Sequence, residues 1–326
     1  MHVAILGATG AVGRTMMDVL AERDFPVERL TLLASERSAG TRLSYKGREY
    51  TVEAPGAGSF EGVDVAIFSA GGGRSLEWAP RAAEEGAVVV DNSSAWRMDP
   101  GVPLVVPEVN SAAIADRPKG IIANPNCSTI QVVVALQPLH TAAGLRRVVL
   151  TTFQSVSGAG EKGKEALRRE VAGERGDESP FSRAIAANAI PQIGSFDAEG
   201  WTEEERKMVN EPRKIMGLPD LKVAPTCVRI PVDVSHAVEI MVELDREMSR
   251  QEAIDVLSEA PGLVVAGRAE EFPTPRDVAG RDEVFVGRVR TDPDMPRTLH
   301  LWVVADNLRK GAATNAVQIA EELTGR

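Results

Sequence analysis

The sequence predicts an α/β protein in which an N-terminal doubly wound parallel sheet precedes an α+β domain with a mostly antiparallel sheet. Strand-like and helix-like segments alternate through residue 123, and β-rich segments with few helices between them dominate after residue 128. A chain of 326 residues is also long for one hydrophobic core. We therefore expect one domain at 1–127 together with a C-terminal helix at 306–326, and a second domain at 128–305.

The composition excludes several classes of protein. Apolar residues make up 43% of the chain and charged residues 26%, which is typical of soluble globular proteins. The net charge of −10 without any basic tract argues against a nucleic-acid partner. No apolar run reaches the length of a membrane span, and a strand at the very N-terminus leaves no room for a signal peptide. We expect a cytoplasmic protein.

The chain opens with a nucleotide-binding pattern. An apolar strand at 2–6 leads into Gly7-Ala8-Thr9-Gly10-Ala11-Val12-Gly13, and a helical pattern continues to about Arg23. The glycines Gly7, Gly10 and Gly13 let the backbone turn tightly and approach a pyrophosphate at the helix N-terminus. This order predicts a Rossmann-type dinucleotide-binding domain.

The end of the next strand, at 30–34, indicates which dinucleotide binds. NAD-specific folds place a carboxylate there to bind the ribose hydroxyls, whereas this chain has Ser35, followed by Arg37 and Ser38. An arginine and two hydroxyls suit a 2′-phosphate, so we predict NADP. Glu36 is the competing observation, because an inward-turned Glu36 would favour NAD.

Further segments complete the predicted elements. In the first domain we expect strands at 63–68 and 87–90, a glycine-rich turn at 71–73 and a helix at 75–85. In the second domain we expect an exposed polar loop at 173–180. A last helix at 308–323 is expected to return to the first domain. The expected strands of the second domain lie at 148–154, 226–232, 235–244, 283–290 and 299–305.

Cys127 is the strongest candidate for a nucleophile. It lies in Asn124-Pro125-Asn126-Cys127-Ser128-Thr129, between a strand-like run at 120–123 and an apolar helical run at 130–136. Unpaired N–H groups and the positive end of a helix dipole stabilise a thiolate at such a junction. The alternative is a small buried hydrophobic side chain, for which the polar neighbours form a poor lining. The only other cysteine is Cys227, and the spacing between the two does not match a metal-binding motif. We therefore predict neither a disulfide nor a metal site.

Several polar residues stand out near the ends of predicted strands. Arg229 lies in an apolar strand, where a buried guanidinium needs an anion; an internal salt bridge is the alternative to a ligand. His236 can serve Cys127 as an acid or base, although a lone histidine is more often structural. Gln154 opens a glycine-rich turn, and Arg97 follows a strand end, where it binds an anion or lies on the surface.

These motifs in this order identify a resemblance to the aspartate-β-semialdehyde dehydrogenase family. The matching stretches are G-A-T-G-A-V-G, S-x-R-S-A-G, N-C-S-T, Q-x-V-S-G-A-G, N-E-x-x-K-I, R-I-P-V and D-N-L-R-K-G-A-A-x-N-A, which run nearly end to end. One departure is Pro212, which replaces a small polar residue after Glu211. Because proline is tolerated in a first helical turn, we expect Glu211 and Lys214 to keep their directions.

The resemblance implies a role for each matching residue. Cys127 would be the acyl-forming nucleophile, His236 the acid/base, and Gln154 would orient the intermediate. Arg229 and Glu211 would hold the amino-acid substrate, and Arg97 and Lys214 would bind phosphate. The NADP contacts would come from Gly7, Thr9, Gly10, Ala11, Val12, Gly13, Ser35, Arg37, Ser38, Ser157, Gly158 and Asn307.

The activity implied by the resemblance is the NADPH-dependent reduction of aspartyl phosphate to aspartate semialdehyde through a cysteine thioester. This reaction serves lysine, threonine, methionine and diaminopimelate biosynthesis, and the second domain would form a homodimer. The nearest alternative is the reduction of N-acetylglutamyl phosphate, whose acylated amine needs no Glu211 partner. Glyceraldehyde-3-phosphate dehydrogenase fits less well, and a non-catalytic nucleotide-binding relative would have lost Cys127 or His236.

Overall fold

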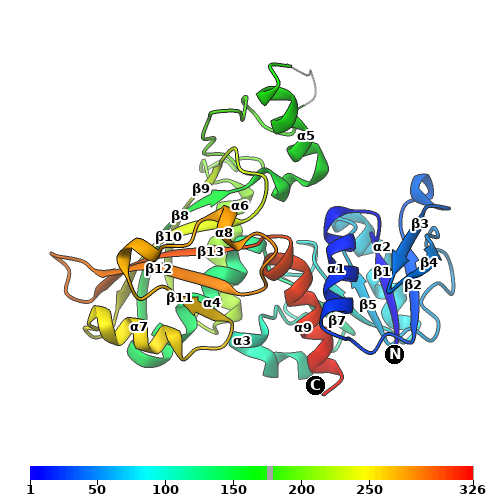
Figure 1. The fold of residues 1–326 in the computed structure, drawn as a ribbon. Coiled ribbons are helices and arrows are strands. Elements are labelled where there is room, and N and C mark those ends of the chain that lie inside the picture. Colours follow the sequence, from blue (N-terminus) through cyan, green and yellow to red (C-terminus); the bar gives the residue numbers. More distant parts are fainter. Residues whose placement is uncertain (175–178, 326) are drawn as a thin grey trace. The chain divides into compact units, whose positions relative to one another are not determined.

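The computed structural model describes residues 1–174 and 179–325 (Figure 1). The centre of the predicted polar loop, residues 175–178, and the C-terminal Arg326 lie outside the described residues. The chain divides into two compact units, one made of 1–126 and 312–326 and the other of 127–311. Cys127 and residues 306–311 thus group with the second unit, whereas we expected them in the first domain. The assignment of cofactor binding to the first domain and of catalysis and dimerisation to the second stays a prediction.

The first unit contains the parallel sheet that the sequence predicts. Its strands run in the order β2-β1-β5-β6-β7, and every neighbouring pair is parallel. The chain passes from β1 to β2 on one side of β1 and later continues with β5 on its other side, so the position between β1 and β5 is a topological switch point. The strands are β1 (His2–Leu6), β2 (Arg29–Leu33), β5 (Val65–Phe68), β6 (Val88–Asp91) and β7 (Ile121–Ala123).

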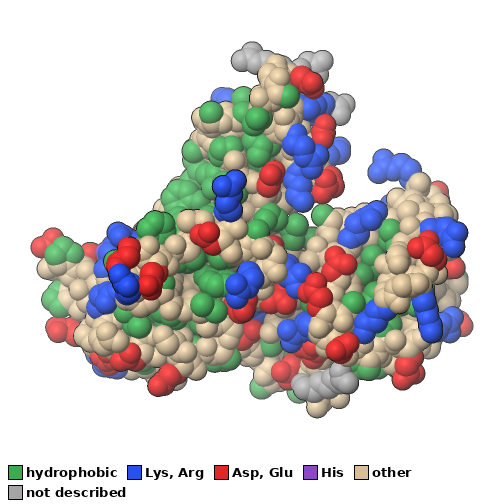
Figure 2. Space-filling model, in the orientation of Figure 1, with side chains coloured by type: hydrophobic (Ala, Val, Ile, Leu, Met, Phe, Trp, Pro, Cys, Tyr) green, Lys and Arg blue, Asp and Glu red, His purple; other side chains and the backbone are tan. Residues whose placement is uncertain are grey.

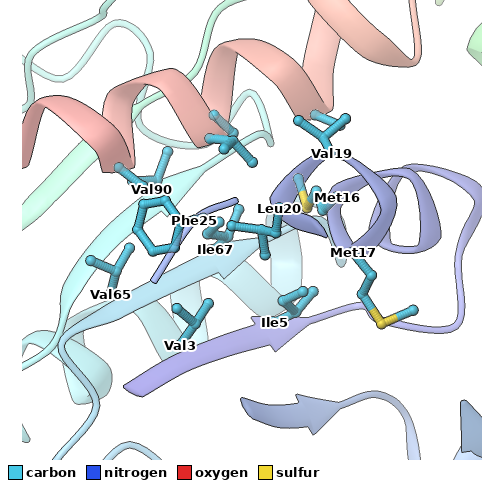
Figure 3. Close-up of a cluster of buried hydrophobic side chains, with 14 of the residues drawn as sticks. Val3, Ile5, Met16, Met17, Val19, Leu20, Phe25, Val65, Ile67 and Val90 are labelled. Atoms are coloured by element: carbon cyan, nitrogen blue, oxygen red, sulfur yellow. The ribbon is translucent and has the colours of Figure 1, made fainter. Parts of the chain in front are cut away.

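Helices cover both faces of this sheet. They are α1 (Ala11–Glu22), α2 (Gly72–Glu84), α3 (Pro107–Asn110) and α9 (Thr314–Leu323). In Figure 3, strand residues such as Ile5 and Ile67 meet Met16 and Leu20 of α1 in one apolar cluster, to which Val317 of α9 also belongs. On the other face α2 packs over β5 and β6. These buried parallel strands are apolar on both faces, as expected for a doubly wound sheet.

A hairpin in the first unit is absent from the sequence predictions. Strands β3 (Arg42–Tyr45) and β4 (Arg48–Thr51) pair antiparallel across the two-residue turn Lys46-Gly47. Both turn residues have positive φ, 46° and 76°, which is the geometry of a tight hairpin. A Lys-Gly turn is a weaker signal than Asn-Gly, because lysine rarely adopts positive φ.

The second unit contains a mixed, mostly antiparallel sheet in the order β11-β12-β13-β10-β8-β9. The predicted fold class is confirmed. The strands are β8 (Leu145–Gln154), β9 (Lys222–Arg229), β10 (His236–Leu244), β11 (Leu263–Val265), β12 (Val284–Thr291) and β13 (Thr298–Ala305). The helices are α4 (Cys127–Ala143), α5 (Gly160–Val171), α6 (Glu203–Ile215), α7 (Arg250–Ser258) and α8 (Pro275–Val278).

The two faces of this second sheet differ in exposure. Helices α4, α6 and α7 pack over one face, and α4 is apolar over most of its circumference because it lies inside the unit. Along β8 the residues toward these helices are buried, whereas the alternate residues Val149, Thr151 and Phe153 are half-buried. Figure 2 shows hydrophobic side chains gathered over the region of β8, β9 and β10.

Three local predictions need correction. Strand β9 ends at Arg229 rather than continuing to residue 232, so Arg229 closes the strand instead of lying inside it. The last helix begins with a π-helical turn, Arg309–Ala313, before α9. Pro212 lies near the C-terminal end of α6, not in a first turn; α6 begins at Glu203 behind a complete capping box at Thr202.

Candidate active site

The glycine turn of the first unit is tightly packed. Gly7 has a φ of +96°, and a Cβ atom there would lie 2.3 Å from the carbonyl oxygen of Ser69. A Cβ at Gly13 would lie 2.3 Å from the carbonyl oxygen of Gly7. Both positions therefore require glycine. Gly7 requires it for the positive φ and for the close backbone contact, and Gly13 for the close backbone contact alone. These glycines bring the turn at the end of β1 against the end of β5.

This turn fits the pyrophosphate of a dinucleotide. Helix α1 begins at Ala11, and its N-cap residue Gly10 provides no side-chain hydrogen bond to the first turn. The backbone N–H groups of Ala11, Val12 and Gly13 start the helix at the switch point, after Thr9. An uncapped helix N-terminus at a switch point attracts a phosphate group.

The end of β2 carries the residues expected to select NADP. Ser35 follows the strand, and Glu36–Ser38 form a short 3-10 helix. The hydroxyl oxygens of Ser35 and Ser38 lie 3.4 Å apart, and both Glu36 and Arg37 are exposed. The structure thus brings the two predicted hydroxyls together, while contact with a cofactor stays a prediction for all of these residues.

Arg97 is buried in the first unit instead of lying on the surface. Its Nε donates to the carbonyl of Asn124 at 3.0 Å, and its Nη2 donates to the carbonyl of Asn92 at 2.7 Å. Asn124 itself bonds to Asn92 and Asn315 through its side chain. Arg97 thus ties the end of β6 to the segment that precedes Cys127, and its binding of phosphate stays a prediction.

Cys127 is the first residue of α4 and is half-buried. The strand-to-helix junction expected from the sequence is therefore present. Gly311 packs against this residue, because a Cβ atom at Gly311 would lie 3.0 Å from the Cβ of Cys127. Burial lowers the pKa of the Arg229 guanidinium, and the negative charges of Glu204 and of a Cys127 thiolate act in the opposite direction, so Cys127 lies within electrostatic range of Arg229. The thiol thus lies at a helix N-terminus with a cation in electrostatic range.

Three of the predicted site residues lie side by side across the second sheet. Gln154 of β8 pairs with His236 of β10 on one side and with Arg229 of β9 on the other. Directly opposed residues of adjacent strands point to the same face, about 5 Å apart. We call Gln154, His236 and Arg229 the register row. All three are buried.

His236 is completely buried, with 0% of its surface exposed. Its Nδ1 accepts a hydrogen bond from the backbone N–H of Ser155 at 3.0 Å and lies 3.1 Å from the hydroxyl of Ser155. Its Nε2 is buried and has no hydrogen-bond partner among the described residues. Burial above all, and then the charge of Arg229, lower the pKa of His236 to about 3, with the Ser235 carbonyl and Glu204 opposing them.

Arg229 is 6% exposed and donates from Nη1 to the carbonyl of Ser155 at 2.7 Å. A Cβ atom at Gly158 would lie 2.8 Å from this Nη1 and 3.4 Å from His236 Nε2. Gly158 is itself exposed. Gly158 thus lies directly against nitrogen atoms of two register-row residues, and a side chain at this position would contact both.

Gln154 is held by two hydrogen bonds. Its Oε1 accepts from the hydroxyl of Thr152 at 3.0 Å, and its Nε2 donates to Glu204 at 3.0 Å. Glu204 in turn accepts from Lys207 at 3.0 Å. Sequence reasoning missed Glu204, because its contact with Gln154 depends on how α6 packs against the sheet.

The remaining predicted residues divide between α6 and the turns after β8 and β13. Glu211 is buried and Lys214 half-buried on α6. Asn307 Oδ1 accepts hydrogen bonds from the hydroxyls of Ser155 and Ser157 and from the backbone N–H of Ser235. Ser155, which sequence reasoning did not single out, thus joins His236 to Asn307.

Two findings concern groups that the described residues lack. Within 1–174 and 179–325, no cluster of histidine, cysteine, aspartate or glutamate side chains is arranged to bind a metal ion. In the same ranges, no helix has both the length and the apolar character needed to cross a membrane.

Comparison with known proteins identifies the family. A model described as "Semialdehyde dehydrogenase, NAD binding domain" matches residues 2–117, and one described as "Semialdehyde dehydrogenase, dimerisation domain" matches 136–310. The chain is 56% identical over 331 residues to aspartate-semialdehyde dehydrogenase of Aquifex aeolicus, an alignment covering 99% of this chain and 97% of that protein.

Solved structures agree with this result. Aspartate semialdehyde dehydrogenase II of Vibrio cholerae, solved in complex with ASA, is similar with a TM-score of 0.97 and 50% identity, over 99% of this chain and 98% of that one. The enzyme of Candida albicans, solved with NADP, is similar with a TM-score of 0.78 and 26% identity, over 99% and 98% of the two chains. The chain belongs to the aspartate-semialdehyde dehydrogenase family.

Proposed function

We propose that this chain catalyses the reversible, NADP-dependent interconversion of L-4-aspartyl phosphate and L-aspartate 4-semialdehyde. The biosynthetic direction is the reductive dephosphorylation, which serves lysine, threonine, methionine and diaminopimelate synthesis in the cytoplasm. The observation that carries the proposal is the placement of Cys127 at the start of α4, within electrostatic range of Arg229 in the register row. Family membership supplies the substrate.

Cys127 is the nucleophile of the proposed reaction. The backbone N–H groups of the first turn of α4 and the positive charge of Arg229 both favour its thiolate. The thiolate adds to the aldehyde carbon in the oxidative direction, and loss of hydride from this adduct leaves a thioester on Cys127. Phosphate then attacks the thioester to give aspartyl phosphate and free the thiolate.

Arg229 and Glu211 bind the amino-acid end of the substrate in this proposal. The described residues accept one hydrogen bond from the Arg229 guanidinium, at the carbonyl of Ser155, and the remaining N–H groups can bind a carboxylate. Glu211 is the partner of the substrate ammonium group, Gln154 orients the intermediate, and Arg97 and Lys214 bind phosphate.

The cofactor binds to the first unit. The Gly7–Gly13 turn fits the pyrophosphate, and Ser35, Arg37 and Ser38 suit a 2′-phosphate. When bound, the nicotinamide ring accepts or donates the hydride. Ser157, Gly158 and Asn307 are further proposed contacts from the second unit.

The chain works as a homodimer in this proposal. The dimerisation-domain model covers 136–310, a range that includes the whole second sheet. On the sheet face away from α4, half-buried apolar residues such as Phe153, Met241 and Trp302 alternate with buried ones. An apolar sheet face of this kind suits burial against a second copy of the chain.

The test is an assay of phosphate-dependent NADP reduction with L-aspartate 4-semialdehyde, run beside the Cys127→Ser variant. We expect NADPH formation that requires phosphate and is lost in the variant, because serine is not ionised at neutral pH. Well-folded wild-type protein that shows no turnover would refute the substrate assignment. Turnover of N-acetylglutamate semialdehyde in its place would identify the alternative reductase.

A further inference from the structure

Glu204 is a buried carboxylate to which the proposed reaction gives no role. It is the second residue of α6 and is 5% exposed. Lys207, one helical turn further along, donates to Glu204 Oε2 at 3.0 Å. The positive end of the α6 dipole also lies at this end of the helix. Both positive charges favour the ionised form of Glu204, which can only accept hydrogen bonds.

The contact with Glu204 fixes the direction of the Gln154 amide. Gln154 Nε2 lies 3.0 Å from Glu204 Oε1, and both side chains are buried. An ionised carboxylate cannot donate a hydrogen bond, so the NH2 group of the amide must face it. The reversed amide would place Oε1 against a carboxylate oxygen. Two buried acceptors without a proton between them are costly, so only one orientation of the amide is favourable.

Thr152 holds the opposite end of the same amide. Thr152 and Gln154 are two residues apart on β8, so their side chains lie on one face of the sheet. The hydroxyl of Thr152, which is completely buried, donates to Gln154 Oε1 at 3.0 Å. A hydroxyl can donate or accept and therefore fits either orientation of the amide. Glu204 thus selects the orientation, and Thr152 strengthens it.

The amide keeps hydrogen-bonding groups for a ligand after both contacts are made. Its NH2 group carries two protons and its oxygen two electron pairs, and the contacts with Glu204 and Thr152 use one of each. The second N–H and the second electron pair therefore have fixed directions. They lie on the strand next to Arg229, which pairs with Gln154 across the sheet.

Glu204 also acts on the site through its charge. Burial lowers the pKa of Arg229 and the pKa of His236, and the charge of Glu204 opposes the shift at both residues. Loss of this charge would therefore affect the register row even if the amide kept its orientation. The effect of the charge and the effect of the hydrogen bond must be separated by different substitutions.

We propose that Glu204 is a positioning residue which, together with Thr152, holds the Gln154 amide in one orientation for the reaction intermediate. The inference rests on the proposed function, in which Gln154 orients that intermediate. The intermediate forms only after the substrate has bound. Loss of the amide orientation should therefore lower kcat and leave KM nearly unchanged.

Two substitutions of Glu204 separate the hydrogen bond from the charge. Glu204→Gln removes the charge but keeps an oxygen that can accept from Gln154 Nε2, whereas Glu204→Leu removes both. We expect kcat to fall about 10- to 100-fold in Glu204→Leu, as loss of a hydrogen bond to a charged group does, with KM within about 3-fold of the wild type. In Glu204→Gln we expect kcat within about 5-fold of the wild type.

Glu203→Leu is the matched control for these variants. Glu203 is the neighbouring carboxylate on α6, but it is exposed and accepts from the hydroxyl of Ser195. We expect its kcat to stay within about 2-fold of the wild type. Equal losses of kcat in Glu204→Gln and Glu204→Leu would show that only the charge matters, and wild-type kcat in Glu204→Leu would show that neither does. Either result overturns the proposal.

A double-mutant cycle tests whether Glu204 acts through Gln154. Gln154→Met removes the amide and keeps an unbranched side chain of similar length. In this background Glu204→Leu has no amide to release, so we expect it to change kcat by less than about 2-fold. A loss of about 10- to 100-fold in both backgrounds would mean that Glu204 acts on another group, and the proposal would be wrong.

Thr152→Val tests the contact at the other end of the amide. This variant removes the hydroxyl and keeps the shape of the side chain. We expect kcat to fall about 3- to 10-fold with KM unchanged, as loss of a neutral hydrogen bond does. Thr298→Val is the matched control, because Thr298 Oγ1 is buried without a hydrogen-bond partner among the described residues. Wild-type kcat in Thr152→Val would overturn the role assigned to Thr152.

The contact between Glu204 and the amide can also be measured without substrate, by NMR of the full-length enzyme labelled with ¹⁵N in its glutamine side chains. The chain has six glutamines, and Gln154→Met identifies the Gln154 signals by their loss. We expect the Gln154 NH2 group to exchange slowly with D2O in the wild type and in Glu203→Leu, because it is buried and hydrogen-bonded, and to exchange faster in Glu204→Leu. Equal exchange in all three proteins would overturn the proposal.

This measurement distinguishes failure of the inference from failure of the proposed function. It needs no turnover, so it decides the contact between Glu204 and Gln154 even if aspartate semialdehyde proves to be the wrong substrate. Conversely, turnover of aspartate semialdehyde with a freely exchanging Gln154 amide supports the proposed function and overturns the positioning role. If Glu204→Leu folds poorly, the wild-type exchange rate still decides, because an amide that exchanges freely there is not held.

Discussion

Replacement of Gly311 by alanine should slow catalysis through a small displacement of Cys127. Gly311 lies in the π-helical turn Arg309–Ala313, and an added Cβ would lie 3.0 Å from the Cys127 Cβ and 3.3 Å from its Cα and carbonyl oxygen. These atoms belong to the start of α4 and cannot rotate away as a long side chain can. The chain must therefore move at Gly311, at Cys127, or at both.

The size of the effect follows from these distances. Carbon atoms pack at about 3.5–4.0 Å, so the Cβ–Cβ contact is short by about 0.5 Å. A misplacement of 1 Å at a reacting group can cost about 100-fold in rate, so half that displacement corresponds to about 10-fold. Alanine is favoured over glycine in a helical turn by up to about 1 kcal/mol, which offsets part of the steric cost to folding.

The assay is steady-state kinetics together with denaturant unfolding of the Gly311→Ala variant. We expect kcat to fall about 10-fold while the free energy of unfolding changes by less than about 1 kcal/mol. Gly267→Ala is the control, because a Cβ there has no atom within 4 Å and the backbone is not left-handed. Wild-type kcat in Gly311→Ala, or an equal loss in the control, would refute the reasoning.

Three further predictions follow from the site and the core. Burial raises the pKa of the Cys227 thiol, so iodoacetamide should alkylate only Cys127 of the folded enzyme, as intact mass shows. Burial likewise raises the pKa of Asp91, so the folded protein binds a proton at this carboxyl more tightly than the unfolded chain does. The folding stability from this group is therefore lost as the pH rises above about 4. Asp91→Asn should therefore raise the denaturation midpoint at neutral pH but not at acidic pH. Gly7→Ala should abolish NADPH binding, measured by fluorescence, and lower the thermal midpoint, because its Cβ would overlap Ser69.

The fold and the position of Cys127 at a strand-to-helix junction were predictable because their signals are local. Cys127 is recognised from a strand, a polar turn and an apolar helix in direct succession, and the structure has that order around α4. The glycine turn at 7–13 is likewise one continuous strand–turn–helix unit. Such short-range patterns depend on backbone conformation and hydrophobic periodicity, which the sequence states directly.

The supporting residues were not predictable because register joins them. Ser155 meets His236 only because β8 and β10 pair with Gln154 opposite His236, across 81 residues of chain. Glu204 meets Gln154 through the packing of α6, and no spacing in the sequence indicates either contact. Pro212 illustrates the same limit: its motif was visible, but its position near the end of α6 depended on where the helix begins.

The register row also explains why the site combines a neutral histidine with a charged arginine. Strand β8, which carries Gln154, lies between β10, which carries His236, and β9, which carries Arg229. The guanidinium therefore acts on the histidine ring through its charge and not through a hydrogen bond. The same backbone segment serves both residues, because Ser155 N donates to His236 while the Ser155 carbonyl accepts from Arg229. Ser155 thus holds both side chains through its own backbone groups. A shift of β8 by one residue would turn Gln154 to the opposite face and move Ser155 away from both partners, so the geometry of the candidate site depends on the strand register.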